Sequence, residues 1–231
     1  MDNPSAWRAQ LLHGQWFKQL PVSIQDSLLA LARPRELAAG QCLFQRGDPP
    51  CGLYAVLAGA MRVGAVSSDG KEALLTLVES PYWFGEISLF DGQPRTHDAF
   101  AEGATQLLWV PQAGLLDWLE RHPRHWRDLA LLMSHKLRWV FVALEQQHLL
   151  AAAPRLAHRL LQIAEGYGER DVPQWRLQVS QEQLALMLSL SRQTINQILR
   201  SLEQAGVVRL GYGEVLILDA PRLRQMAGHP G

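Results

Sequence analysis

The stretch from Ser180 to Gln204 constrains the fold more than any other part of the sequence, because two helix starts follow each other across a short turn. Ser180 and Gln183 have the spacing of a capping box, so a helix is expected to begin there. Ser189 and Leu190 would form the turn, and Ser191 would cap a second helix. The pattern predicts a helix-turn-helix.

The second helix has an apolar side and a polar side. The apolar members are Ile195, Ile198, Leu199 and Leu202, and the polar members are Arg192, Gln193, Asn196 and Gln197. Arginine can form paired hydrogen bonds with guanine, and glutamine or asparagine with adenine, in the major groove. Hydroxyls near helix starts can reach phosphates. We therefore expect double-stranded DNA as a partner, contacted by Ser180, Gln181, Ser191, Arg192, Gln193, Thr194, Asn196 and Gln197.

A hairpin is predicted directly after these helices. Two apolar runs, 207–210 and 214–218, flank Gly211-Tyr212-Gly213. In that position the hairpin would be the wing of a winged helix. The alternative is an ordinary helical hairpin with a polar outer face.

The front of the chain has a different pattern. Between Glu36 and Val110, short apolar runs alternate with turn signals, which is typical of a β-sandwich or β-roll. Asp69-Gly70, between the runs 61–66 and 73–78, marks a hairpin. Before Pro34, apolar residues at helical spacing predict helices.

After Pro111 the pattern is helical again. It predicts a short helix over 112–120 and a long one over 124–150, roughly 40 Å at 1.5 Å per residue. Apolar residues recur along the long helix at spacings of three and four: Leu137, Val140 or Phe141, and Leu144. Such a stripe on a protruding helix needs a partner, so we expect a homodimer seam. Alternatively, the stripe packs on its own β domain.

Ala151 to Pro154 is the expected hinge. Proline disfavours helical geometry at the residue before it, so a new helix is expected over 155–165. The chain would thus divide into an effector domain (1–122), a dimerisation helix (123–150) and a DNA-binding domain (151–231).

The net charge of zero conceals an asymmetry. Residues 1–120 carry 8 Lys and Arg against 13 Asp and Glu, whereas 121–150 carry 5 against 2 and 151–231 carry 9 against 7. The back of the chain is therefore better suited than the front to approach phosphates.

Several classes of protein are disfavoured. No apolar run approaches the roughly 20 residues that span a bilayer, and Met1 to Gln10 lacks the order of a secretory signal. We expect a cytoplasmic protein without a membrane partner.

Cys42 and Cys51 lack the spacing of a zinc site, so no metal is expected. A cupin-like enzyme would need clustered histidines, and the roll offers only His97. With no recognisable nucleophile-plus-base pair, we expect no catalytic residues and no enzyme.

Several motifs, in order along the chain, resemble the CRP/FNR family of bacterial regulators. Ser191-Arg-Gln-Thr194 is similar to that family's Ser-Arg-Glu-Thr recognition-helix start. Leu43–Asp48, Gly52–Gly59 and Phe84–Phe90 resemble its cyclic-nucleotide-binding β-roll, and Pro94–Thr96 resembles the end of its phosphate-binding cassette. The resemblance implies an α+β fold with three parts. These are an N-terminal double-stranded β-helix (jelly-roll-like) sensor domain, a long dimerisation helix and a C-terminal winged helix-turn-helix.

The resemblance also implies an effector site in the roll. In the family, the residue matching Glu86 holds a ribose and the one matching Arg95 pairs with a cyclic phosphate, which suits the fork of donors on an arginine. The expected effector-binding residues are Gly85, Glu86, Ile87, Ser88, Arg95, Thr96, Val140 and Phe141. Alternatively, Glu86 and Arg95 form an ion pair that only ties the roll together.

The expected effector is a small molecule, such as a cyclic nucleotide. Val140 and Phe141 stand where cAMP-binding members contact adenine, and their side chains cannot hydrogen-bond a base edge. His97 also follows Thr96 where the best-known members carry a small residue. These differences disfavour cAMP and leave a different nucleotide, an apolar ligand or an empty pocket.

The DNA-binding half departs from the family pattern too. Gln193 stands where Glu is common and Gln197 where Arg is common, so the half-site should differ from familiar operators. Ser189 replaces a glycine at the turn. The expected function is a transcription regulator that binds a palindromic site as a homodimer, is gated from the β-roll and contacts RNA polymerase. The alternative is an effector-independent regulator with a degenerate pocket.

Overall fold

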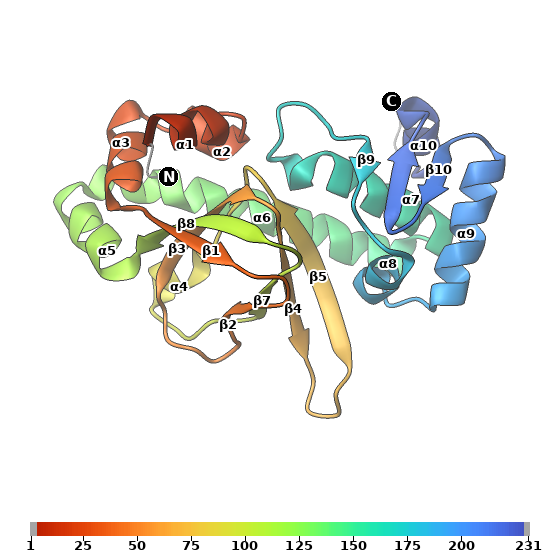
Figure 1. Ribbon diagram of the computed structural model, residues 1–231, viewed down its shortest axis with the longest axis horizontal. Helices are drawn as coiled ribbons and strands as arrows, with labels where there is room; N and C mark the ends of the chain where they lie inside the picture. The colour runs from red at the N-terminus through yellow and green to blue at the C-terminus, as the bar shows by residue number, and fades with distance from the viewer. Residues whose placement is uncertain (1–3, 229–231) are drawn as a thin grey trace. The chain divides into compact units, whose positions relative to one another are not determined.

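The computed structural model describes residues 4–228 (Figure 1). Residues 1–3 and 229–231, at the ends of the expected first and third domains, lie outside the described part. The chain forms two compact units. The N-terminal unit comprises 1–65, 76–138 and 169–171, and the C-terminal unit comprises 66–75, 139–168 and 172–231.

The elements follow one another in the order helices, strands, helices, winged helix. The helices are α1 (Pro4–Leu11), α2 (Gln15–Gln19), α3 (Val22–Leu31), α4 (Ile87–Asp91), α5 (Gln112–Arg121), α6 (Trp126–Leu149), α7 (Ala152–Ala164), α8 (Gln181–Leu188), α9 (Arg192–Gln204) and α10 (Ala220–Met226), with 3₁₀ turns η1 (Pro123–His125) and η2 (Gly166–Gly168). The strands are β1 (Arg33–Leu37), β2 (Cys42–Phe44), β3 (Gly52–Ala58), β4 (Ala60–Val66), β5 (Glu72–Glu79), β6 (Trp83–Phe84), β7 (Asp98–Ala101), β8 (Thr105–Pro111), β9 (Arg176–Leu177), β10 (Val208–Gly211) and β11 (Glu214–Ile217).

Strands β1 to β8 form a β-roll of two four-stranded sheets, as the turn spacing predicts. Their strand orders are β1-β8-β3-β6 and β2-β7-β4-β5, and the registered pairs are antiparallel. β3 is buried along nearly its whole length, which explains why its sequence is a continuous apolar run. The predicted hairpin is present between β4 and β5, where Ser67 N donates to Lys71 O at 2.9 Å.

Aromatic side chains join the N-terminal helices to this roll. Trp83 lies with its ring centroid 5.6 Å from that of Phe17, stacked, and 5.4 Å from that of Trp16, edge-on. All three are buried in one apolar core that also includes residues of α3, α5 and α6. The segment 169–171 belongs to this unit as well, since Gln15 N donates to Glu169 O at 2.9 Å.

The long helix was predicted from Arg124, and α6 runs from Trp126 to Leu149 after the turn η1. Five of its apolar side chains are half exposed or more: Leu137 (50%), Val140 (60%), Phe141 (62%), Leu144 (50%) and, at its end, Leu149 (73%).

The start of α7 corrects the hinge prediction. The helix begins at Ala152 instead of Arg155, so the expectation that Ala153 would be non-helical was wrong. Pro154 lies in the first turn, where a backbone N–H has no intrahelical partner and its absence costs little. Arg155 N then donates to Ala151 O at 3.2 Å and the helix continues.

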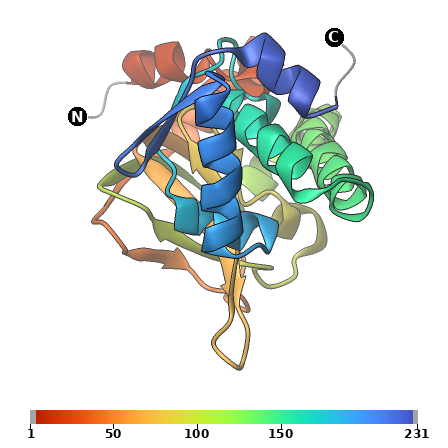
Figure 2. The same cartoon turned by 90° about the vertical axis from the view of Figure 1, so that its right-hand side faces the viewer.

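The C-terminal unit contains the predicted helix pair and wing. β10 and β11 pair antiparallel, with Val208 opposite Ile217, and α9 packs beside them (Figure 2). The third strand, β9, was not predicted, because two residues are too short to give a periodic signal. Ser189 ends α8 with a φ of 54°, a left-handed conformation that glycine adopts more readily.

Candidate DNA-binding surface and effector pocket

Both caps of the helix-turn-helix have the predicted hydrogen bonds. Ser180 Oγ accepts from Gln183 N at 3.2 Å, while Gln183 Oε1 accepts from Ser180 N at 2.7 Å. Ser191 Oγ accepts from Thr194 N at 3.0 Å. The two helices therefore start at fixed points, and the first turn of α9 has a defined orientation.

The expected DNA-binding residues fall into two groups. Arg192, Gln193 and Gln197 are exposed on α9. The hydroxyls of Ser191 and Thr194 lie 2.8 Å apart, so both already take part in the cap.

Gln181 and Asn196 are also engaged, since Asn196 Nδ2 donates to Gln181 Oε1 at 2.9 Å. These two residues differ from the exposed α9 side chains in being half-buried. Ser180 is half-buried too.

Three further exposed residues were missed from the sequence. Arg200 follows Gln197 by three positions on α9, and this spacing was a signal for it. Arg209 on β10 and Tyr212 at the tip of the hairpin are exposed as well. Their placement depends on the hairpin, so no helical spacing could have found them.

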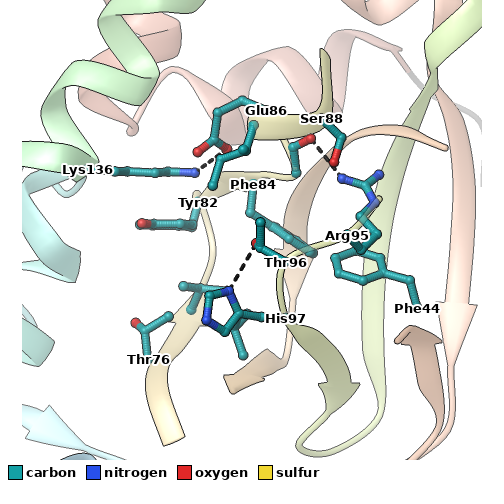
Figure 3. A pocket seen from close by; sticks show the side chains of 14 residues that line it. Phe44, Thr76, Tyr82, Phe84, Glu86, Ser88, Arg95, Thr96, His97 and Lys136 are labelled. Carbon is teal, nitrogen blue, oxygen red and sulfur yellow. Dashed lines mark hydrogen bonds and ion pairs between the residues drawn. The ribbon is translucent and has the colours of Figure 1, made fainter. Parts of the chain in front are cut away.

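A cavity of about 150 Å³ lies inside the β-roll (Figure 3). Six of the expected effector residues line it: Gly85, Glu86, Ile87, Ser88, Arg95 and Thr96. Aromatic and aliphatic side chains make up much of the remaining wall, namely Phe44, Val63, Val78, Tyr82 and Phe84. Val140 and Phe141 are not among the lining residues and are exposed on α6.

Arg95 is 4% exposed, and its guanidinium is held by backbone. Nη1 donates to Gly85 O at 2.8 Å and Nη2 donates to Gly52 O at 2.6 Å, while Cys51 Sγ lies 3.0 Å from Nη2. The guanidinium also lies 4.5 Å from the ring centre of Phe44. Its Nε is buried without a hydrogen-bond partner.

Gly85 makes this approach possible. Its φ is 96°, and a Cβ at this position would lie 2.9 Å from Gly52 O and 3.0 Å from Arg95 Nη1. A side chain here would be strained and would also displace the arginine.

Glu86 pairs with Lys136 of α6, and the Glu86–Arg95 ion pair considered from the sequence does not form. Lys136 Nζ lies 2.6 Å from Glu86 Oε2 and donates to Trp83 O at 2.7 Å. Both side chains are largely buried, at 5% and 19% exposed. The sequence offered no signal for Lys136, because it lies 50 residues from Glu86.

Apart from Arg95, Glu86 and Lys136, the polar side chains that line the cavity are hydroxyls and the imidazole of His97. Burial lowers the pKa of His97, and the charge of nearby Arg46 lowers it further, so the imidazole is uncharged at pH 7. Its Nδ1 lies 3.0 Å from Thr96 Oγ1. Thr76 Oγ1 is buried in the wall without a partner.

The cavity therefore does not fit a cyclic phosphate in the described conformation. The groups that would hold one are present, but the backbone carbonyls occupy Arg95 and Lys136 occupies Glu86. An anionic group of a ligand would compete with these carbonyls for the terminal nitrogens of Arg95, whereas Thr76 Oγ1 has no partner to give up.

A Ser–His–Asp arrangement occurs where none was recognised in the sequence. His125 Nδ1 lies 2.6 Å from Asp128 Oδ2, and Ser23 Oγ lies 3.4 Å from His125 Nε2. Arg124 Nε also donates to this Nε2 at 3.2 Å, and His125 is 2% exposed. A buried imidazole whose Nε2 is held by an arginine is a link between α3 and the start of α6, and not an available base.

Among residues 4–228, no three His, Cys, Asp or Glu side chains are grouped closely enough to hold a metal ion. No helix in the same range is both long and apolar enough to cross a membrane.

Known proteins match both halves of the chain. Residues 34–122 match a family model described as a cyclic nucleotide-binding domain, and residues 154–226 match one described as a Crp-like helix-turn-helix domain. The cyclic AMP receptor protein of Thermus thermophilus is 31% identical over 203 residues, which cover 87% of this chain and 91% of that protein. The chain belongs to the CRP/FNR family. It is a DNA-binding transcription regulator with a cyclic-nucleotide-binding-type domain.

One further relative and one solved structure are similar to this chain. The CRP-like cAMP-activated global transcriptional regulator of Mycobacterium tuberculosis is 29% identical to this CRP/FNR protein over 213 residues. These residues cover 91% of this chain and 95% of the Mycobacterium protein. The structure of FixK2 from Bradyrhizobium japonicum has the same fold, with a TM-score of 0.77 at 19% identity over 87% of this chain and 99% of that one. The Mycobacterium protein is named as a transcriptional regulator.

Proposed function

We propose that this regulator binds a palindromic DNA site as a homodimer, with α9 of each copy in the major groove. The observation that supports this most strongly is the exposed polar start of α9, directly after a capped and rigid turn. A recognition helix reads bases with residues near its N-terminus. The bacterial cytoplasm, where chromosomal DNA is found, would be its place of action.

Arg192, Gln193 and Gln197 are the proposed base readers. All three are exposed. Arginine favours guanine and glutamine favours adenine, since each can form two hydrogen bonds with the base edge. The expected half-site thus contains a guanine beside adenines. Ser180, Gln181, Ser191 and Thr194 would lie against the sugar-phosphate backbone.

The dimer would form along α6. Leu137, Val140, Phe141 and Leu144 recur at spacings of three and four, and each is half exposed or more. Burying such a stripe against its copy stabilises a parallel helix pair. The domains would then be 1–122 for the effector, 123–150 for the seam and 151–231 for DNA, with RNA polymerase as a further partner.

We further propose that a small molecule in the roll cavity controls DNA binding. The relatives from Thermus and Mycobacterium are named for cyclic AMP. Here the entering ligand would have to replace Lys136 at Glu86 or the carbonyls at Arg95. Because Lys136 belongs to α6, the helix of the proposed dimer seam, release of Lys136 from Glu86 would act on that helix directly. Val140 and Phe141 of the partner copy would provide apolar contacts to the ligand.

The backbone carbonyls that accept from both terminal nitrogens of Arg95 favour a second candidate, a regulator that binds DNA without any effector. Titration calorimetry with cAMP, cGMP and a cyclic dinucleotide separates the two. Heat of binding to the wild type that is lost in Arg95→Ala supports the gated form, whereas tight DNA binding with no heat from any nucleotide supports the second.

Selection of bound duplexes from a random pool tests the proposed DNA function. We expect enrichment of one inverted repeat. Gel shift on that repeat should then show Arg192→Ala weakened by about 1–3 kcal/mol, the usual value of a bidentate base contact. Equal binding of Arg192→Ala and the wild type would contradict the assigned reader.

A further inference from the structure

An amide pair joins the two helices of the helix-turn-helix. Asn196 is the fifth residue of α9, and Gln181 is the first residue of α8. Asn196 Nδ2 donates to Gln181 Oε1 at 2.9 Å in a partly buried setting. The bond uses one amide hydrogen of Asn196 and the acceptor of Gln181, and so fixes the direction of both side chains.

Asn196 lies at the margin of the polar face of α9. Successive residues are about 100° apart around a helix. Gln193 and Gln197 therefore point almost directly away from the buried side of α9, which contains Ile195 and Leu199. Asn196 falls between the two sides, in agreement with its half-buried state and its contact with α8.

Gln181 keeps its donors free for another partner in this arrangement. Its Oε1 faces Asn196, which leaves both hydrogens of Nε2 available. The residue lies where α8 begins, and the first helix of a helix-turn-helix crosses the DNA backbone. Phosphate oxygens accept hydrogen bonds from side-chain amides and from the N–H groups of helix starts.

We infer that Asn196 reads no base and is instead a positioning residue, which orients the Gln181 amide to donate to a DNA phosphate. The inference rests on the proposed DNA-binding function and narrows it, since it leaves Arg192, Gln193 and Gln197 as the base readers. A neutral amide displaces no counterion, so this contact adds affinity without changing the salt dependence of binding.

The test measures the affinity of the full-length protein for its selected duplex and for duplexes with each base pair of one half-site changed. Asn196→Ala and Gln181→Ala should each weaken binding roughly three- to tenfold, as expected for one hydrogen bond. The loss should be the same on every duplex, and the salt slope should not change. The double variant should be no more than about twofold weaker than either single variant, because the two residues act together.

Gln197→Ala is the matched control, since it removes an amide from the same helix. It should lose preference at one base pair, while Asn196→Ala keeps the wild-type preferences throughout. The ratio of affinities between duplexes does not depend on the fraction of folded protein, so a destabilised variant still gives a valid answer.

Two results would overturn the inference while leaving the proposed function intact. One is a loss of preference at a single base pair in Asn196→Ala. The other is a double variant whose loss equals the product of the single losses. A wild type without preference among the duplexes would instead overturn the proposed function itself.

Discussion

The buried pair between Lys136 and Glu86 gives a prediction of definite size. Replacing Lys136 with methionine keeps the length of the side chain but removes the charge that lies 2.6 Å from Glu86 Oε2. It also removes the donor to Trp83 O. Breaking a buried pair by removing one partner costs about 3–5 kcal/mol, because the other charge is left without compensation.

The exposed fractions place the effect within that range. Glu86 is 5% exposed and Lys136 is 19% exposed, so some water reaches the lysine but little reaches the carboxylate. We therefore expect Lys136→Met to lose about 3 kcal/mol of unfolding free energy. Urea unfolding at pH 7, followed by tryptophan fluorescence, measures this loss because Trp83 lies beside the pair.

Two variants control for other causes. Lys136→Arg keeps a cation beside Glu86 and should therefore lose less stability than Lys136→Met. Adding Glu86→Gln to Lys136→Met removes the stranded charge and should recover most of the loss. A loss below about 1 kcal/mol in Lys136→Met, the value typical of exposed pairs, would refute the argument. So would a double variant no more stable than Lys136→Met.

Three further predictions concern stability and assembly. Burial raises the pKa of Glu169 in the folded protein above its usual 4.5. Ionisation of this carboxyl therefore destabilises the fold as the pH rises through the raised pKa. Glu169→Gln should be more stable than the wild type at pH 7, and the difference should vanish near pH 4 when urea unfolding is measured over a pH series. Ser189 has a φ of 54°, so Ser189→Gly should raise stability by about 0.5–1 kcal/mol, seen as a higher Tm, and a lower Tm would contradict the strain argument. Phe141 is 62% exposed on α6, so Phe141→Glu should sediment as a monomer and lose at least about tenfold in DNA affinity, whereas an unchanged dimer would contradict the proposed seam.

The sequence predicted the C-terminal unit in more detail than the roll cavity. Caps at Ser180 and Ser191 follow from local spacing, since the groups they bond lie three residues away. The cavity depends on partners far apart in sequence, such as Lys136 with Glu86, which no periodic pattern indicates. The error at Ala153 has a local cause, because proline acts differently in the first turn than inside a helix.

The hydrogen-bond partners within the expected sites could not be predicted from the sequence either. Spacing indicated which residues of α9 are polar, but not that Asn196 would turn toward Gln181 while Gln197 stays exposed. In the roll, the motif that contains Arg95 indicated a phosphate site. The hydrogen bonds to Gly85 O and Gly52 O became known only from the fold.

Binding to half-sites of varied spacing tests the central claim most directly. A homodimer with α9 of each copy in the major groove requires two inverted half-sites about one helical turn apart, on the same side of the duplex. We predict that one dimer binds the selected inverted repeat and that inserting about five base pairs between its halves, which rotates them by roughly half a turn, reduces binding to the level of a single half-site. Equal affinity for the repeat, the lengthened repeat and an isolated half-site would contradict the claim.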